Sequence, residues 1–265
     1  YQNVYYNTVK VRDQYPFYVY NGNLNLTIKN NIFSTESSSY AAFYSYYGIT
    51  GLVSDYNDLH TGYTYPVSYY YSNKTLAQWQ TDGYDSNSVM IDPVFNNDST
   101  LVPLALALDN LGTPLTSITD DINDVIRSTS TPDLGAQEFS VSSTPLSETY
   151  TVGSGGDFTT LDSLRLSLMA YGISGPVTIN FLSGTYTDIM SLGPIPGASA
   201  TNTVTFQSAD AHSDSVIWEN TSDNYNDNYV LRLNGTDHVT LKHITFKNLG
   251  YSYGRRLVLT GITDS

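Results

Sequence analysis

The fold is decided by the stretch His238-Val239-Thr240-Leu241-Lys242-His243-Ile244-Thr245-Phe246-Lys247-Asn248. Apolar and polar residues alternate along it, which is typical of a strand with one buried face. Four apolar side chains share that face, with one irregular step near His243: Val239, Leu241, Ile244 and Phe246. The pattern predicts one turn, or rung, of a β-solenoid.

Short runs of β-branched and aromatic residues recur along the rest of the chain, separated by clusters of Asn, Gly and Ser. Strands are predicted within residues 4–11, 18–19, 24–33, 52–59, 177–181, 204–206, 216–218, 229–233, 239–246 and 257–259. Helix signals are rare. We predict a short helix at 75–80 and an amphipathic helix at about 160–170, with Leu161, Leu164 and Leu168 on one face.

An Asn recurs in the first half at the interval of a solenoid rung. It stands two residues before an apolar residue in Tyr6-Asn7-Thr8-Val9, Lys29-Asn30-Asn31-Ile32 and Tyr56-Asn57-Asp58-Leu59. In a parallel β-helix the rungs stack, so amides at equivalent corners can hydrogen-bond to one another. We therefore predict an Asn ladder formed by Asn7, Asn30 and Asn57. The simpler alternative is that Asn is frequent here because it favours turns.

Composition excludes several classes of function. A formal net charge of −14, with only 11 Lys and Arg, disfavours a nucleic-acid partner. The absence of Cys excludes disulfides, thiolate metal sites and thiol nucleophiles. No apolar run is long enough for a membrane span. Few charges, 24 Tyr and abundant amide and hydroxyl side chains suit an extracellular bacterial protein, secreted or on the cell surface.

Near the middle of the chain, the end of one module meets the beginning of another. Pro132-Asp133-Leu134-Gly135-Ala136-Gln137-Glu138-Phe139 closes the first, and Val152-Gly153-Ser154-Gly155-Gly156-Asp157-Phe158-Thr159-Thr160-Leu161 opens the second. We predict the last rungs and tail of one parallel β-helix at 1–140, a polar linker at 141–150, and the cap and first rungs of another at 151–265. The chain is then a segment of a tandem array, and a further rung is expected beyond Ser265.

The tail of the first module carries a resemblance. Residues 75–80, 85–88 and 92–95, then Asp121, Arg127 and 132–139, resemble in order the C-terminal end of secreted bacterial right-handed parallel β-helix proteins of the pectate-lyase-like superfamily. Members of that group usually have a Gly shortly before the Arg, which is missing here. We expect charge-assisted hydrogen bonds to pin the tail to the solenoid through Asp121, Arg127, Asp133 and Glu138.

The start of the second module carries another resemblance. Residues 155–161, 175–181 and 184–186 look like the N-terminal rung of pectin-methylesterase-like β-helices, over about 150–190. The Gly-rich run does not match a phosphate-binding loop. The helix at 160–170 is expected to cap the first rung and shield its unpaired strand groups. No residue matches the catalytic carboxylates or Arg of that esterase family, so no catalytic role is carried over.

Candidate sites are few, and we predict no catalytic, cofactor-binding or metal-binding residue. Aromatic rings stack on sugars, so a carbohydrate platform is one interpretation of Tyr69, Tyr70, Tyr71 and Trp79, together with Tyr63 and Tyr65. The other, which we favour, is that this group packs a loop against the solenoid. Short motifs around Ser163 and Ser215 resemble O-glycosylation sequences of gliding and gut-dwelling bacteria. Acidic runs at 120–124 and 223–227 are compatible with structural calcium, although neither has EF-hand spacing.

Two classes of function remain open. The first, which we favour, is a structural or adhesive repeat of a very large bacterial surface protein. Its partners would be neighbouring repeats or end-to-end copies, and extracellular polysaccharide is a further candidate. The second is a polysaccharide lyase or esterase whose catalytic rungs lie outside this segment. A lyase would need basic residues, and the densest basic patch is Lys242, His243, Lys247, Arg255 and Arg256. The alternative, which we favour, is that these are solvated residues on the rung surface.

Overall fold

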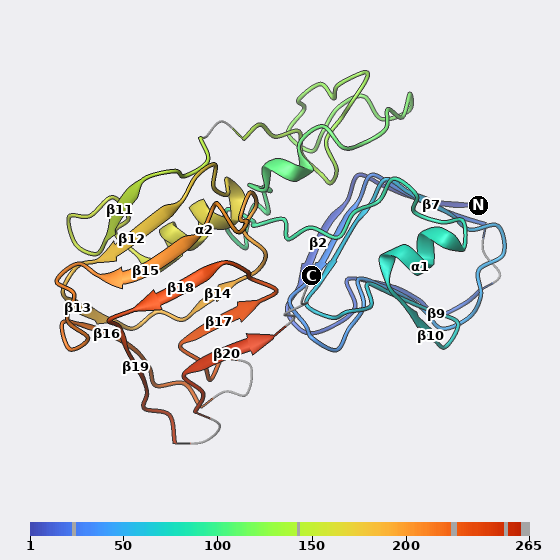
Figure 1. Ribbon diagram of the computed structural model, residues 1–265. Coiled ribbons are helices and arrows are strands. Elements are labelled where there is room, and N and C mark those ends of the chain that lie inside the picture. The colour runs from blue at the N-terminus through green and yellow to red at the C-terminus, as the bar shows by residue number, and fades with distance from the viewer. Residues whose placement is uncertain (23–24, 142–143, 224–226, 252–253, 261–265) are drawn as a thin grey trace. The chain divides into compact units, whose positions relative to one another are not determined.

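The computed structural model describes residues 1–22, 25–141, 144–223, 227–251 and 254–260 (Figure 1). The chain divides into two compact units, Tyr1–Ser142 and Ser143–Ser265, here called unit 1 and unit 2. Each unit is a parallel β-helix, as the alternating pattern predicts. Leu24, expected at the start of a strand, and residues 224–226 of the second acidic run lie outside the described residues. Within the described ranges, no helix is long and apolar enough to cross a membrane.

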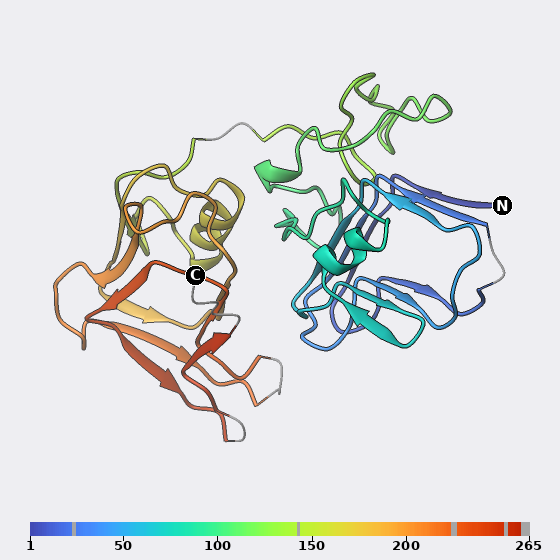
Figure 2. The same ribbon diagram turned by 45° about the vertical axis from the view of Figure 1, so that its right-hand side comes forward.

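Unit 1 contains three rungs, and each rung gives one strand to each of three parallel sheets (Figure 2). The first rung has β1 (Gln2–Tyr5), β2 (Thr8–Val11) and β3 (Phe17–Val19); the second has β4 (Leu26–Lys29), β5 (Ile32–Thr35) and β6 (Phe43–Ser45); the third has β7 (Val53–Asp55), β8 (Asp58–Thr61) and β9 (Val67–Tyr69). Inward side chains stack from rung to rung in a core that includes Phe33, Phe43 and Leu59. Burial of this apolar interior is what stabilises the unit.

Each predicted run over 4–11, 24–33 and 52–59 is broken into two strands by a corner. The corner residue has a left-handed backbone conformation in every rung: φ is 55° at Tyr6, 60° at Asn30 and 56° at Tyr56. Such conformations are uncommon for residues other than Gly, and Asn adopts them most readily. A strained corner that recurs in every rung must be stabilised by its surroundings. The residue after each corner is an Asn, and its hydrogen bonds provide this stabilisation.

The corners are joined by an Asn ladder, but its middle member is Asn31 and not Asn30. Asn31 accepts hydrogen bonds from the backbone N–H and the side-chain amide of Asn7, both at 2.9 Å and 24 positions away. Asn57, 26 positions further on, accepts the corresponding bonds from Asn31 at 3.1 and 3.0 Å. Asn30 instead occupies the left-handed corner, and its side chain exchanges hydrogen bonds with the backbone of Thr113. The predicted ladder position was therefore wrong by one residue.

The sequence predicts the ladder one residue too early because the outer face of the β2–β5–β8 sheet, here called the middle sheet, is covered by the tail and also carries an apolar residue. Val9, Phe33 and Leu59 are paired in register and are the equivalent apolar positions of the three rungs. Ile32, which the sequence suggested as the equivalent position, is paired with Thr8 and Asp58. It is fully buried, and the tail passes so close that a Cβ on Gly135 would lie 2.9 Å from its Cδ1.

Asp58 lies on the same sheet and is completely buried. Its Oδ1 accepts a hydrogen bond from the N–H of Ile91 at 2.9 Å, while Oδ2 has no hydrogen-bond partner in the structure. Burial raises the pKa of Asp58 well above its ordinary value, because the charged form loses its hydration. Asp58 is therefore a source of pH dependence in unit 1.

The third rung ends in a hairpin and a short helix. Strand β10 (Ser72–Lys74) pairs antiparallel with β9, and α1 (Leu76–Thr81) follows, close to the predicted 75–80. Thr75 caps α1 and forms a capping box with Gln78. The remaining residues to 141 form an irregular tail with one 3₁₀ turn, η1 (Leu106–Leu108), and no strand of the described sheets.

Unit 2 repeats the plan with its own three sheets. The strands are β11 (Thr149–Val152), β12 (Val177–Phe181), β13 (Gly184–Tyr186), β14 (Met190–Leu192), β15 (Val204–Ser208), β16 (Val216–Asn220), β17 (Leu231–Asn234), β18 (Val239–Lys242), β19 (Thr245–Asn248) and β20 (Leu257–Thr260). Phe181, Phe206 and Trp218 pack together in the interior, with ring centroids 5.1 and 5.9 Å apart. The irregular step predicted near His243 is a left-handed residue, φ 52°, between β18 and β19.

The helix predicted at 160–170 is α2 (Leu161–Ala170), which buries Leu161, Leu164 and Leu168 and contacts β14. The predicted linker was too long. Leu146 already pairs with Ile173, and its N–H donates to the carbonyl of Gly172. Strand β11 then begins at Thr149, so the second half of 141–150 belongs to the first turn of unit 2.

Candidate functional site

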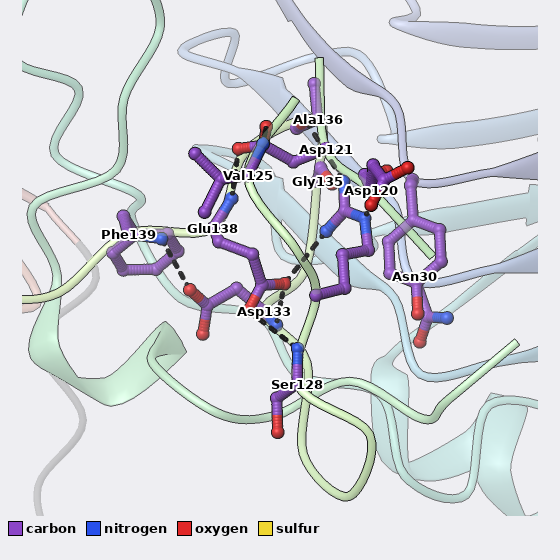
Figure 3. Close-up of polar contacts among 12 residues, drawn as sticks. Asn30, Asp120, Asp121, Val125, Ser128, Asp133, Gly135, Ala136, Glu138 and Phe139 are labelled. Atoms are coloured by element: carbon purple, nitrogen blue, oxygen red, sulfur yellow. Dashed lines mark hydrogen bonds and ion pairs between the residues drawn. The ribbon is translucent and has the colours of Figure 1, made fainter. Parts of the chain in front are cut away.

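The charged cluster in the tail is built around Arg127, which is 5% exposed (Figure 3). Its guanidinium forms an ion pair with Glu138 at 3.0 Å and donates to the carbonyls of Gly135 and Ala136. The same group lies 3.8 Å from the centroid of the Tyr6 ring, at the corner of the first rung. The ion pair and these hydrogen bonds join parts of the tail to one another, and not the tail to the solenoid as the sequence predicted. Arg127 contacts the solenoid through the cation–π contact with Tyr6, which the sequence did not indicate.

The carboxylates of Asp121 and Asp133, in the cluster around Arg127, accept hydrogen bonds from backbone N–H groups. Asp121 accepts from Asn123, Val125 and Glu138, and Asp133 accepts from Asn110 and Phe139. Burial opposes the charge of Asp121, but these hydrogen bonds outweigh it and hold its pKa below the ordinary value. For Asp133 burial dominates and raises the pKa to about 6. These contacts give the charged groups of the cluster their hydrogen-bond partners, so a structural role explains the cluster.

Two of the four predicted sugar-stacking residues lie in the core of unit 1. Trp79 is 1% exposed, stacks on Tyr84 at 4.3 Å and donates from Nε1 to Asp85 at 2.7 Å. Tyr69 is half-buried against Trp79, and its hydroxyl accepts a hydrogen bond from the N–H of Ile49 at 2.5 Å. The stacking prediction was wrong for Trp79, because α1 turns it inward, and Tyr69 belongs to the same packing.

The other two, Tyr70 and Tyr71, form the two-residue loop of the β9–β10 hairpin. Both have left-handed backbone conformations, with φ 48° and 63°. Two-residue hairpin loops with φ > 0 at both positions prefer Asn-Gly or Asp-Gly, and a left-handed residue with a Cβ costs about 1–2 kcal/mol. The side chains are 58% and 68% exposed, so burial does not offset this strain. The hairpin displays two Tyr rings at an energetic cost.

Tyr70 and Tyr71 belong to a larger exposed group. Tyr20 follows β3, Tyr46 and Tyr47 follow β6, and the hairpin loop follows β9, so all lie beyond the carboxyl ends of neighbouring parallel strands. Tyr46 stands at its centre, with ring centroids 5.5 Å from Tyr20, 4.9 Å from Tyr47 and 5.0 Å from Tyr71. We call these five residues the tyrosine cluster.

The rings of the tyrosine cluster meet Tyr46 in two ways. The planes of Tyr47 and Tyr71 make angles of 80° and 68° with that of Tyr46, whereas Tyr20 stacks on it at 22°. Edge-to-face contacts leave ring faces uncovered, and Tyr47 and Tyr71 are 42% and 68% exposed. Tyr20 has one face on Tyr46 and is 63% exposed, so the cluster presents open aromatic surface at all three rings.

A second tyrosine group on the same sheet is arranged differently. Tyr18 and Tyr44 pair in register on β3 and β6, and their rings are parallel within 3° at 5.0 Å. Tyr15 packs on Tyr44 at 4.4 Å and on Tyr40 at 4.8 Å. We call these four residues the tyrosine stack. Since the Tyr18 and Tyr44 rings cover one another, the stack offers less free ring surface than the cluster.

Sequence reasoning missed Tyr18, Tyr20, Tyr44 and Tyr46, although a signal was present. The patterns Tyr18-Val19-Tyr20 and Tyr44-Ser45-Tyr46 recur one rung apart, with small or apolar inward residues between them. Strand alternation places both Tyr of each pattern on the outer face. Comparing outward positions from rung to rung would have found the cluster.

The predicted glycosylation residues have structural contacts in unit 2. The Ser163 hydroxyl donates to the carbonyl of Thr160 in the capping box of α2. The Ser215 hydroxyl donates to the carbonyl of His212 and pairs with Ser208. In the described part of the chain, no group of three or more His, Asp or Glu side chains could hold a metal ion. From the basic patch, Lys242, His243, Arg255 and Arg256 are exposed.

Comparisons with protein-family models, curated proteins and solved structures gave no match to this chain. The fold and the two tyrosine groups are therefore the basis for a functional conclusion.

Proposed function

We propose that the protein is an adhesive segment of a large extracellular bacterial surface protein and that it binds polysaccharide through the tyrosine cluster. The observation that carries this proposal is the strained, exposed Tyr70-Tyr71 loop. Strained backbone persists where the displayed group has a use, and stacking on sugar rings is a use that suits exposed aromatic faces. The resemblance of the tail to pectate-lyase-like proteins and the Cys-free, charge-poor composition support an extracellular location.

In this proposal the two β-helical units supply length and stiffness, and unit 1 supplies the contact surface. Neighbouring units of the same array are the proposed structural partners. Reading the parent sequence on both sides of this segment checks the array. Repeated copies of the 132–161 junction support it, whereas a single β-helix with a Lys- and Arg-lined cleft favours a polysaccharide lyase.

Polysaccharide binding can be measured by affinity electrophoresis against a panel of neutral and acidic polymers. The wild-type chain should be retarded by at least one polymer, and the triple variant Tyr20→Ser/Tyr47→Ser/Tyr71→Ser should migrate freely. Retardation of the triple variant equal to wild type would remove the cluster from the proposal. Turnover of uronate polymers by the wild-type chain, with or without calcium, would favour the enzyme instead.

A further inference from the structure

The chemical class of the ligand can be narrowed by the charge of the surface around the tyrosine cluster. The five residues of the tyrosine cluster lie in three stretches of the chain that contain no Asp, Glu, Lys, Arg or His: 14–28, 37–54 and 61–73. In the whole chain 14% of residues are charged and the net charge is −14. An aromatic surface without charge in an acidic protein offers no counter-charge to an ionic ligand.

The nearest cation along the chain is also neutralised. Lys74 ends β10 directly after the uncharged stretch, and its Nζ forms an ion pair with Asp82 at 2.6 Å. A uronate carboxylate placed against the cluster would lose hydration without gaining a charged partner. Hydroxyl groups of a neutral sugar can instead exchange hydrogen bonds with phenol hydroxyls, which both donate and accept.

Tyr71 is uncharged over the usual pH range. A hydrogen bond with Tyr46, followed by partial desolvation, raises the pKa of Tyr71 to about 12. A Tyr is neutral below its pKa, so this ring carries no charge at neutral or mildly alkaline pH.

The cluster is also elongated along the direction in which the rungs stack. Tyr20, Tyr46 and Tyr71 follow the third-sheet strands of the first, second and third rungs, in that order. Their ring centroids are separated by successive steps of 5.5 and 5.0 Å. Rings from three rungs can contact several consecutive sugars, whereas one terminal sugar would leave most of the cluster unused.

We infer that the tyrosine cluster binds an internal stretch of a neutral polysaccharide, lying across the three rungs of unit 1. This inference rests on the proposed carbohydrate function and specifies its ligand. Contact would occur between the apolar C–H faces of the sugars and the open rings of Tyr20, Tyr47 and Tyr71. Because no ion pair contributes, affinity should depend little on salt.

The test uses the full 265-residue chain with defined polymers. Hydroxyethyl cellulose, mixed-linkage β-glucan and arabinoxylan represent neutral chains, and polygalacturonate and alginate represent uronates. We expect binding to at least one neutral polymer that changes less than about 2-fold between low and high salt. For that polymer, matching oligosaccharides should bind more tightly as they lengthen from one to about four sugars.

Single variants locate the site. Tyr71→Ser and Tyr47→Ser should each weaken binding about 10-fold, the loss expected for one aromatic contact. The matched control is Tyr251→Ser in unit 2, since Tyr251 is 99% exposed and lies outside the cluster. It should bind like wild type. Circular dichroism of each variant separates loss of binding from loss of fold.

Three results would overturn the inference. Salt-sensitive binding to the uronates alone would show that the ligand is acidic, while leaving the carbohydrate function intact. Equal affinity for a single sugar and for longer oligosaccharides would show that the polymer is not read along its length. Binding to none of the polymers, with self-association that Tyr71→Ser abolishes, would show that the cluster joins copies of the chain, and the proposed function would fail with it.

Discussion

The two units share a fold but differ in their outer surfaces. In unit 1, outward positions of neighbouring rungs carry aromatic pairs such as Tyr18 and Tyr44. In unit 2, the register of β11, β12, β15 and β18 places four hydroxyl side chains in one row: Thr149, Thr178, Thr205 and Thr240. Their interiors are alike, with stacked aliphatic and aromatic residues in both.

This difference shows that the β-helix does not require surface tyrosine. Unit 2 forms its rungs with hydroxyl, amide and charged residues at outward positions, such as Thr178, Gln207 and Lys242, and most of the 24 Tyr lie in unit 1. Inward positions are constrained by packing, whereas outward positions are free to carry a function. The tyrosine surface is therefore not a requirement of the fold, and in the proposed function it is the contact surface of unit 1.

The chain offers a direct way to follow each unit separately. It contains two Trp, with Trp79 buried in unit 1 and Trp218 buried in unit 2. In a Trp218→Phe background, the fluorescence of Trp79 reports unfolding of unit 1 alone. The reciprocal Trp79→Phe background reports unit 2. Urea titrations in the two backgrounds give the free energy of unfolding of each unit.

The largest expected effect breaks the anchor that only unit 1 has. Arg127→Ala should lower the free energy of unfolding of unit 1 by about 3 to 5 kcal/mol, because it removes a buried guanidinium that pairs with the half-buried Glu138, bonds two tail carbonyls and packs on Tyr6. Unit 2 should not change. The control is Arg165→Ala, whose ion pair with Asp162 is exposed at the surface of α2 and should contribute less than about 1 kcal/mol. Equal losses in both variants would contradict a dominant role for the tail.

A smaller loss is expected from the Asn ladder. Asn31→Ala removes hydrogen bonds to Asn7 and Asn57 and should destabilise unit 1 by about 2 to 3 kcal/mol. Asn97→Ala, in an exposed part of the tail, removes only the hydrogen bonds of a local turn to Ser99 and Thr100 and should cost less than about 1 kcal/mol. If Asn31→Ala is as mild as the control, the ladder does not stabilise the corners.

The hairpin loop should respond in the opposite direction. Tyr70→Asn/Tyr71→Gly restores the residues that this type of loop prefers, so unit 1 should gain about 1 kcal/mol. Polysaccharide binding should fall at the same time. Urea unfolding and affinity electrophoresis measure the two changes. A variant that loses stability, or keeps full affinity, would separate the strain from the function.

The last expected effect is a change in the pH dependence of stability. Because the pKa of Asp58 is raised in the folded state, folded unit 1 holds this proton more tightly than the unfolded chain. The contribution of Asp58 to stability is therefore present below the ordinary pKa of Asp and is lost as pH rises toward the raised value. Asp58→Asn should flatten the fall in stability between pH 4 and pH 7. Asp188→Asn, on the surface of unit 2, should leave the slope of unit 1 unchanged, and an unaltered slope in Asp58→Asn would refute the assignment.

The sequence predicts features that depend on local pattern and fails where distant residues decide. Alternation around Val239 and helical spacing of Leu161, Leu164 and Leu168 predict a rung and a helix correctly, because neighbouring residues determine them. The choice between Asn30 and Asn31 depends on Ile32, which is apolar because a tail about a hundred positions later covers it.

The candidate site shows the same limit. Tyr69, Tyr70 and Tyr71 are identical and consecutive, so composition cannot separate the ring that packs inward from the two that are displayed. Their roles follow from the position of the turn, which fixes Tyr69 as the last residue of β9. Trp79 is buried for a similar reason, since the capping box at Thr75 sets the rotation of α1.

The antiparallel strand β10 also has a consequence for aggregation. An open strand edge can pair with strands of other molecules. In the third sheet, β10 covers the outer edge of β9, and it is only three residues long and ends in Lys74. Short strands and Lys are features that discourage edge-to-edge pairing. The hairpin that displays the tyrosines therefore also protects the β9 side of this sheet from pairing with other molecules.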